Sequence, residues 1–283
     1  MKFIPMSDLL TQASRGGYAV PSFCVWNAET IETVLRTASE LRAVVILMNG
    51  PGEFSQLGPH EVGAVANVVA ERFAVPAALH LDHGNSLSQV EECLAAGYTS
   101  VMLDYSTRPF AENVEAMSRV VEMAHPLGVS VEGELGVVGR VDQISAEGGE
   151  ESALTDPAMA AAFVEQTGID ALAVSIGNAH GHYPQLPRLD FERLAALREA
   201  VRIPLVLHGG TGTPEADLRH AISLGIAKVN VASELVTAIR QSLMEQWGSG
   251  ENLWIPAAQT VAMQALAKVM AKWFHMTGSA GRA

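Results

Sequence analysis

The segment "PAALHLDHG" (residues 76–84) changes character within a few positions. Its first half is apolar, as expected for a buried strand, whereas its second half contains His80, Asp82 and His83 before Gly84. A buried charge is costly unless it is paired or bound to a ligand. The polar end of this strand therefore predicts a binding or catalytic site, which residues elsewhere in the chain would complete.

Short apolar, β-branched segments recur along the chain, and amphipathic segments with a helical period separate them. The predicted strands are 18–23, 43–48, 76–81, 100–104, 129–134, 171–176, 204–208 and 227–231, and the predicted helices include 28–42, 59–73 and 110–125. Eight alternating units in 283 residues predict an α/β fold, a closed (β/α)8 (TIM) barrel that forms a single domain over residues 1–283. A doubly wound sheet is the alternative topology. We also expect an extra N-terminal helix at 6–15, at the barrel base, and a long C-terminal helix at 255–274.

Composition narrows the class of partner. The net charge of −13 argues against nucleic acid or an acidic membrane surface as the partner. Cys24 and Cys93 form no disulfide framework, and from Asp8 within the N-terminal segment and the lack of an apolar stretch of membrane-spanning length we expect neither a signal peptide nor a membrane span. We therefore expect a cytoplasmic protein that acts on a small molecule. An anionic substrate would need a local device to hold it.

Polar residues gather where the predicted strands end, which in such a barrel is the site of chemistry. His83, His180 and His208 end or follow three different strands, and each precedes a glycine. A single histidine of this kind is usually a core or surface residue. Three neutral imidazoles with an open fourth position are typical of a catalytic zinc site, so their coincidence predicts one. His80 shares a face of its strand with Asp82, and it is expected to support the site.

Two later segments have the character of an anion site. "HGGTGTP" (208–214) follows the seventh predicted strand, and "NVAS" (230–233) follows the eighth and leads into a helix. Glycines permit close backbone approach, and the N–H groups at a helix start bind anions without net positive charge. Glycines that only form tight turns are the alternative for either segment alone. On adjacent strands, the two together predict a phosphate site.

The long connection 135–155 is rich in glycine and acidic residues and follows the fifth strand, which ends in Glu132 and Glu134. Loops of this length in a compact domain are usually functional or disordered. Its place at the end of a strand predicts a mobile loop over the active site.

The chain resembles the class II, zinc-dependent ketose-bisphosphate aldolases of the fructose- and tagatose-1,6-bisphosphate type. The resemblance is carried, in order along the chain, by "RGGYAVPSF", "LHLDHG", "SVMLD", "VEGELG", "LAVSIGNAHG", "PLVLHGGTG", "KVNVASEL" and "GSAGRA". It implies a lyase that reversibly cleaves a ketose 1,6-bisphosphate to dihydroxyacetone phosphate and glyceraldehyde 3-phosphate. It also implies a homodimer or homotetramer.

The resemblance further implies roles for individual residues. Zn²⁺ would be bound by His83, His180 and His208 as a Lewis acid, and Asp82 would exchange the proton of the C4 hydroxyl. The implied phosphate contacts are Gly181, Gly209, Gly210, Thr211, Asn230, Val231, Ala232 and Ser233, with Na⁺ or K⁺ near the phosphate in some members. Asp104 and Glu132 would orient the histidines or hold metal in an alternative position, unless they are ordinary solvated carboxylates. Arg282 would contact the second phosphate, unless it is a solvated charge.

The sequence departs from the family pattern at several positions. Asp142 stands where a loop glutamate that handles the C3 proton is expected, and Cys24, Asn178 and Tyr105 replace other residue types. These changes leave open the aldehyde half of the substrate, so another phosphorylated ketose, such as a sugar acid or a monophosphate, is the alternative. The alternative hypotheses from other functional classes are a metal-dependent hydrolase and a non-catalytic sugar-phosphate sensor.

Overall fold

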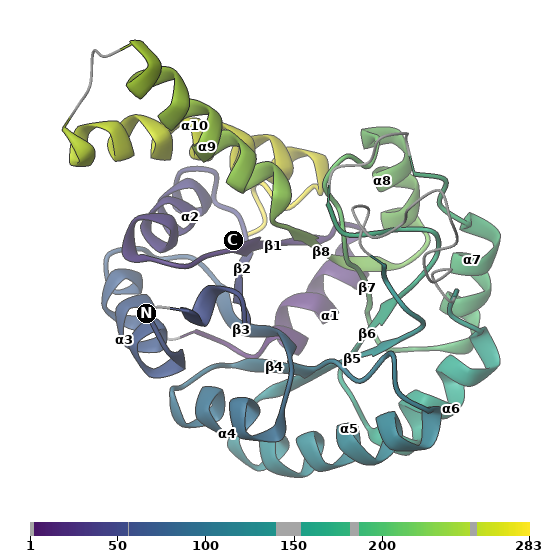
Figure 1. The fold of residues 1–283 in the computed structure, drawn as a ribbon. Coiled ribbons are helices and arrows are strands. Elements are labelled where there is room, and N and C mark those ends of the chain that lie inside the picture. Colours follow the sequence, from purple (N-terminus) through teal and green to yellow (C-terminus); the bar gives the residue numbers. More distant parts are fainter. Residues whose placement is uncertain (1–2, 56, 140–153, 182–186, 250–253) are drawn as a thin grey trace.

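The computed structural model describes residues 3–55, 57–139, 154–181, 187–249 and 254–283, and within them the chain forms a closed parallel barrel (Figure 1). Its strands are β1 (Val20–Cys24), β2 (Val45–Asn49), β3 (Ala77–Gly84), β4 (Ser100–Leu103), β5 (Ser130–Leu135), β6 (Ala171–Val174), β7 (Leu205–Leu207) and β8 (Ile226–Val231). Each strand pairs in parallel with the next, and β8 pairs with β1. The barrel prediction is confirmed, and the doubly wound alternative is wrong.

Helices surround the barrel in the expected alternation (Figure 1). The helices that follow β1 to β7 are α2 (Ala28–Glu40), α3 (Pro59–Ala70), α4 (Leu87–Ala95), α5 (Phe110–Ala124), α6 (Pro157–Thr167), α7 (Phe191–Ala200) and α8 (Glu215–Ser223). Two short 3₁₀ turns, η1 (Glu53–Ser55) and η2 (His125–Leu127), lie in the connections. Side chains at the helix starts fix these connections: Asn27 and Thr30 form a capping box on α2, and Asp156 caps α6 through Met159 N.

The predicted N-terminal helix α1 (Met6–Gly16) closes the amino end of the barrel. Its apolar face, which includes Met6, Leu9 and Leu10, belongs to one buried cluster with the inward-facing side chains of the strands, such as Ile46 and Ala78. A second, larger cluster lies between the strands and the outer helices. Because α1 fills the amino end, the carboxyl end of the barrel is left as the place for a site.

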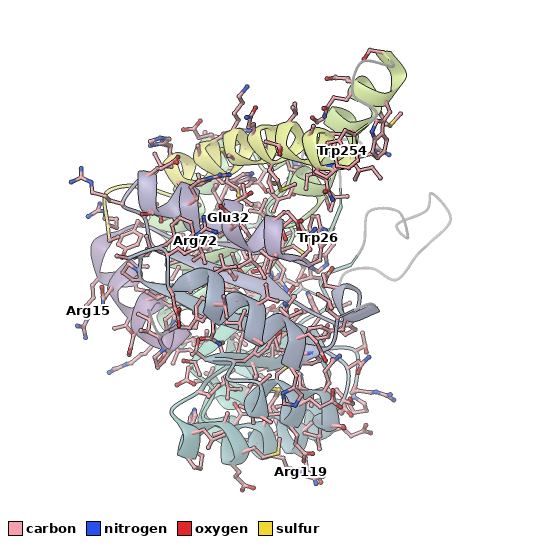
Figure 2. The ribbon with its side chains drawn as sticks, turned by 90° about the vertical axis from the view of Figure 1, so that its left-hand side faces the viewer. Arg15, Trp26, Glu32, Arg72, Arg119 and Trp254 are labelled. Atoms are coloured by element: carbon pink, nitrogen blue, oxygen red, sulfur yellow. The ribbon has the colours of Figure 1, made fainter. Side chains whose placement is uncertain are left out.

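The last two helices, α9 (Ser233–Ser249) and α10 (Ile255–Met276), pack on each other and project beyond the ring (Figure 1). In the side view of Figure 2, Trp26, which follows β1, and Trp254 lie toward one end of the barrel, and Arg15 of α1 lies at the other. None of the described helices is both long and apolar enough to cross a membrane.

After α10 the chain returns to the amino end of the barrel. Gly281 N donates to Leu41 O, and Ala283 N donates to Arg42 O, both just before β2. The Arg282 guanidinium lies 5.0 Å from the ring centre of Tyr18, just before β1. The expectation that Arg282 contacts a phosphate in its own chain's site is therefore wrong, because α10 carries the terminus to the opposite end of the barrel.

Candidate metal centre and active site

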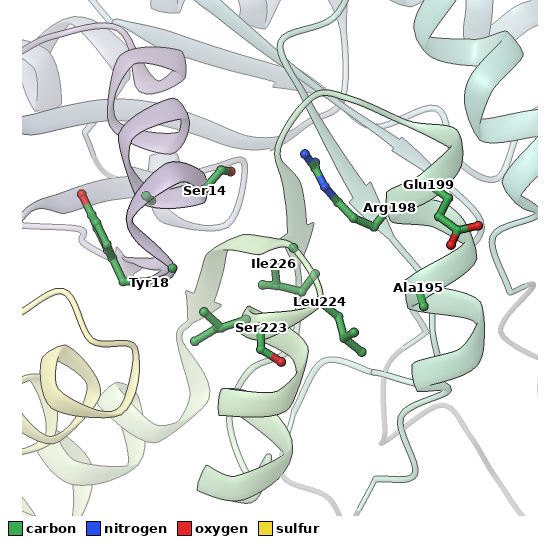
Figure 3. Close-up of a pocket in the computed structure, with 12 residues that line it drawn as sticks. Ser14, Tyr18, Ala195, Arg198, Glu199, Ser223, Leu224 and Ile226 are labelled. Atoms are coloured by element: carbon green, nitrogen blue, oxygen red, sulfur yellow. The ribbon is translucent and has the colours of Figure 1, made fainter.

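A cavity of about 710 Å³ opens at the carboxyl end of the barrel. It is bounded by the ends of β1, β3, β4 and β6, by the connection after β2 and by α9; its lining includes Cys24, Trp26, Glu53, His83, Asp104, His180, Gly181, Ala232, Ser233 and Arg240. A second cavity, of about 360 Å³, lies between α1, α7 and α8 (Figure 3). It contains none of the residues predicted for the site, and its charged lining is Arg198 and Glu199. The candidate active site is therefore the first cavity, which several of the predicted site residues line.

The three predicted metal ligands meet at this mouth. Each of His83, His180 and His208 offers one ring nitrogen, and these three atoms lie within 4.8 Å of one another. His83 Nε2 is 3.3 Å from His180 Nε2. His208 Nδ1 and Glu134 Oε2 lie 3.1 Å apart, yet neither buried atom makes a hydrogen bond within the described residues. Nitrogen donors around a common point, with buried atoms that lack partners, fit a Zn²⁺ ion.

The backbone at His83 is unusual for a strand. His83 has a φ of +47°, a left-handed conformation that costs free energy for a residue with a Cβ atom. The pairing of β3 with β4 shifts register between Leu81 and Gly84 at the same place. A Cβ atom at Gly84 would lie 2.5 Å from Met102 O, so only glycine allows β3 to pack this closely on β4. The irregular strand end turns the His83 ring toward His180 and His208.

Carboxylates fix two of the three histidine rings from behind. His83 Nδ1 is 2.7 Å from Asp104 Oδ2, and Asp104 Oδ1 accepts a hydrogen bond from Ser106 Oγ. His208 Nε2 is 2.9 Å from Glu132 Oε1. A carboxylate on one ring nitrogen sets the tautomer and leaves the other nitrogen for a metal. In this structure Asp104 and Glu132 contact histidines, as expected for residues that orient them.

The electrostatics of the three rings differ. Burial lowers the pKa of His208, but the neighbouring carboxylates of Glu132 and Glu134 outweigh burial and raise it to about 10. Burial, together with His83 and His208, lowers the pKa of His180 to about 3. Burial also opposes protonation of His83, but Asp82 and Asp104 raise its pKa. Without metal, the site thus favours positive charge on His208 and His83.

Asp82 lies beside these rings, at the end of β3. Burial opposes its ionisation, but the neighbouring His83, His208 and Lys228 lower its pKa to about 2. Asn230 Nδ2 donates to Asp82 Oδ1 at 2.8 Å, and the Asp82 side chain is 16% exposed. Asp82 is therefore an ionised, partly accessible proton acceptor next to the metal ligands.

The two predicted phosphate segments adjoin each other. Gly210 N donates to Asn230 O, and Glu234 N donates to Thr211 Oγ1 at the first turn of α9. Gly209 has a φ of +65°, and a Cβ atom there would collide with the carbonyl oxygen of Ala179. Of the remaining predicted contacts, Gly181, Ala232 and Ser233 line the cavity, whereas the Val231 side chain is buried in the core.

Sequence reasoning assigned no role to several residues of the site. Lys228 is fully buried against Glu132, and Glu134 faces His208. Trp26, Glu53 and Arg240 line the outer part of the cavity. A lysine inside the apolar segment "AKVNV" was the available signal for Lys228, and the spacing of Glu134 two residues from Glu132, on the same face of the strand, was the signal for Glu134. Asp142 lies outside the described residues.

Comparisons with known proteins agree with this geometry. A family model described as "Fructose-bisphosphate aldolase class-II" matches residues 4–282. The YdjI aldolase from Escherichia coli K12 is 34% identical, with 99% of each chain covered and a TM-score of 0.89. A structure titled as a putative fructose-1,6-biphosphate aldolase from Coccidioides immitis is 30% identical, covering 97% of this chain and 96% of that one, with a TM-score of 0.86. The fructose-bisphosphate aldolase (Fba) from Campylobacter jejuni is 22% identical over 100% of this chain and 97% of that one, with a TM-score of 0.86, which shows the fold alone.

Proposed function

Because the chain belongs to the class-II fructose-bisphosphate aldolase family and is therefore a lyase, we propose that it reversibly cleaves a ketose 1,6-bisphosphate, of fructose or tagatose, to dihydroxyacetone phosphate and glyceraldehyde 3-phosphate. The observation that carries the proposal is the convergence of His83, His180 and His208 beside an ionised Asp82. Three nitrogen ligands and an adjacent proton acceptor are what metal-assisted aldol cleavage requires.

His83, His180 and His208 would hold the Zn²⁺ ion, which when bound polarises the substrate ketone as a Lewis acid. Asp82 takes the proton of the C4 hydroxyl while the C3–C4 bond breaks, and it returns that proton in the condensation direction. Its low pKa keeps it ionised at neutral pH. Asn230 holds one carboxylate oxygen at 2.8 Å and so fixes the direction of the other. Asp142 supplies the proton to C3 in this scheme.

One phosphate of the substrate is assigned to the segments after β7 and β8. The backbone at Gly209, Gly210 and Thr211 adjoins the start of α9 at Ser233, whose N–H groups attract an anion. Gly181, which also lines the cavity, is assigned to the same phosphate. This arrangement explains how a chain of net charge −13 holds a phosphate, with Na⁺ or K⁺ as an additional counterion.

The far half of the substrate would lie between α9 and the connections after β1 and β2. Among the described residues that line the cavity, Arg240 is the one arginine or lysine, and it stands two turns along α9 from Ser233. Residues at this spacing share a helix face. A cation there favours a substrate with an anionic far end, which is either a second phosphate or the carboxylate of a sugar acid. The sugar-acid phosphate is therefore the second candidate.

A substrate panel tests the proposal. Zinc-loaded protein would be assayed for release of dihydroxyacetone phosphate from fructose and tagatose 1,6-bisphosphates, from a ketose 1-phosphate with a neutral end and from one that ends in a carboxylate. Turnover of a bisphosphate that disappears on chelation and returns with Zn²⁺ is the expected result. Turnover of only the carboxylate substrate selects the second candidate, and no turnover of any ketose phosphate overturns both.

Arg240→Gln separates the two ends of the substrate. It should raise KM for substrates with an anionic far end, because a charge-assisted hydrogen bond contributes about 1.5–3 kcal/mol. KM for the neutral ketose 1-phosphate should not change. Arg119→Gln, which removes the same charge from an exposed position of α5, is the matched control. An equal effect of R240Q on all substrates would mean that Arg240 does not recognise the far end.

We also propose that the protein is cytoplasmic and forms a homodimer or homotetramer, and the α9–α10 arm supports the oligomer. Met244, Trp247, Trp254 and Ile255 are exposed near its tip, with Trp254 73% exposed. Exposed apolar side chains gathered at one place favour a protein partner. Sedimentation of the wild type and of Trp247→Lys should show a dimer or larger species that this variant dissociates. A wild-type monomer would refute the proposal.

A further inference from the structure

A continuous line of buried polar side chains lies under the three histidines. It links β7 to β4 through His208, Glu132, Lys228, His80 and Ser100, and every member is 0% exposed. Glu132 Oε1 is 2.9 Å from His208 Nε2, and Lys228 Nζ donates to Glu132 Oε2 at 2.7 Å. Lys228 Nζ is also 3.3 Å from His80 Nε2, and His80 Nδ1 is 2.8 Å from Ser100 Oγ.

The position of Lys228 is costly unless it has a specific purpose. A fully buried ammonium group loses its hydration, and a paired carboxylate recovers that loss only with good geometry and further hydrogen bonds. Replacing such a pair with apolar residues is often neutral or stabilising. A contribution to stability alone therefore does not explain the Lys228–Glu132 pair. Glu132 also contacts the proposed metal ligand His208, which suggests that the pair serves the metal centre.

Elementary hydrogen-bond rules fix the protons along this line. Lys228 has donors only, so His80 Nε2 must accept, and His80 Nδ1 therefore carries a proton that it donates to Ser100 Oγ. An ionised Glu132 accepts only, so the proton between Glu132 and His208 belongs to His208 Nε2. In neutral His208 the lone pair then lies on Nδ1, which is 3.1 Å from Glu134 Oε2, and neither of these two buried atoms makes a hydrogen bond within the described residues.

We propose that Lys228 is a positioning residue for the metal centre: by holding Glu132 as an acceptor, it sets the His208 tautomer that presents Nδ1 to the metal. Lys228 touches no metal ligand and acts through Glu132, whose two oxygens are divided between His208 and Lys228. His80 completes the cradle of Lys228 and holds its Nζ from the β3 side. The inference rests on the proposed zinc site.

Without the lysine, Glu132 would be a buried carboxylate with one free oxygen. The carboxylate would lose the hydrogen bond that holds Oε2, so Oε1 would no longer be fixed beside His208 Nε2. Without a fixed acceptor at Nε2, part of the population would carry its proton on Nδ1, next to Glu134 Oε2, where a metal cannot bind.

The test compares Lys228→Met, Glu132→Gln and the double variant, with Lys268→Met at an exposed position of α10 as the matched control. Zinc affinity would be measured by competition with a chelator, and the ligand field by the absorption of bound Co²⁺. Histidine ¹⁵N spectra of metal-free protein, recorded over a range of pH, would report the tautomer of His208. We expect K228M to weaken zinc binding ~10–100-fold, as loss of such an outer partner does, with mixed tautomers at His208.

The double variant separates positioning from folding. K228M alone leaves a carboxylate unpaired and can fail to fold, whereas K228M/E132Q removes both charges and should unfold near the wild-type temperature. Its glutamine can accept from or donate to His208, so weak zinc binding and mixed tautomers should persist. Wild-type zinc affinity and a single Nε2–H tautomer in the double variant would overturn the inference. A wild type that binds no zinc would instead refute the proposed function, and the tautomer spectra would still test Lys228.

Discussion

Asp82→Asn removes the proposed proton acceptor with the smallest structural change. Asn230 Nδ2 donates to Asp82 Oδ1 at 2.8 Å, and an amide oxygen at the same place accepts the same hydrogen bond. The three histidines are untouched, so bound zinc should stay at the wild-type level. An amide is not a base, and positioned proton transfer contributes ~10²–10⁴-fold, or about 3–5 kcal/mol, to the rate of such a step. We expect kcat for cleavage to fall by this factor with little change in KM.

The assay is release of dihydroxyacetone phosphate by zinc-loaded protein, with Asp8→Asn, at an exposed position of α1, as the control. A second measurement uses exchange of the C3 proton of dihydroxyacetone phosphate with deuterium from the solvent. This exchange involves no C4 hydroxyl, so it should persist in D82N while cleavage is lost. Cleavage by D82N within about tenfold of wild type would refute the role of Asp82. Equal loss of cleavage and exchange would instead make Asp82 a group needed for binding or metal retention.

Three further predictions concern the scaffold and the metal. Gly209→Ala should raise KM and lower zinc retention. The new Cβ atom would collide with Ala179, which precedes the metal ligand His180, and the positive φ of residue 209 is strained for alanine. Steady-state kinetics and metal analysis measure the two effects. Burial lowers the pKa of His208, but Glu132 and Glu134 outweigh burial and raise it to about 10, so this ring must lose a proton to bind zinc at pH 7. Zinc uptake at pH 7 should therefore release a proton, and zinc affinity should rise up to a pH of about 10. Calorimetry in buffers of different ionisation heat detects the proton release. Asp156→Ala should lower stability by about 1 kcal/mol through loss of the α6 cap, with kcat unchanged; thermal unfolding measures it.

The barrel was predictable because its signals are local. A strand buried on both faces needs a continuous apolar run, as in residues 43–48, and an outer helix needs one apolar face, as in residues 28–42. Both signals appear in the sequence where the structure has β2 and α2. Three of the site's residues were equally visible, because His83, His180 and His208 interrupt the pattern where strands end.

The residues that the sequence could not assign depend on contacts between distant segments. Lys228 would be a solvated lysine in most strands, and only barrel closure brings it to Glu132 and His80, 96 and 148 residues away. Arg282 was assigned to the wrong end because nothing in "GSAGRA" records the direction of the helix before it. The positive φ of His83 likewise follows from the close packing of β3 on β4 at Gly84, which one segment does not reveal.

The site divides into two parts that differ in how they are supported. The metal ligands and Asp82 are held by strand ends and by buried partners such as Glu132 and Lys228, so a change in any of them disturbs several strands at once. The outer cavity is lined by Cys24 at the carboxyl end of β1, by Glu53 in the connection after β2 and by Arg240 of the projecting helix α9, outside the hydrogen-bonded group that holds the histidines. Departures from the family pattern at Cys24 can therefore change which sugar is accepted while leaving the cleavage chemistry intact. On this argument, exchange of Cys24 for asparagine should shift the ratio of kcat/KM between substrates and leave zinc affinity unchanged.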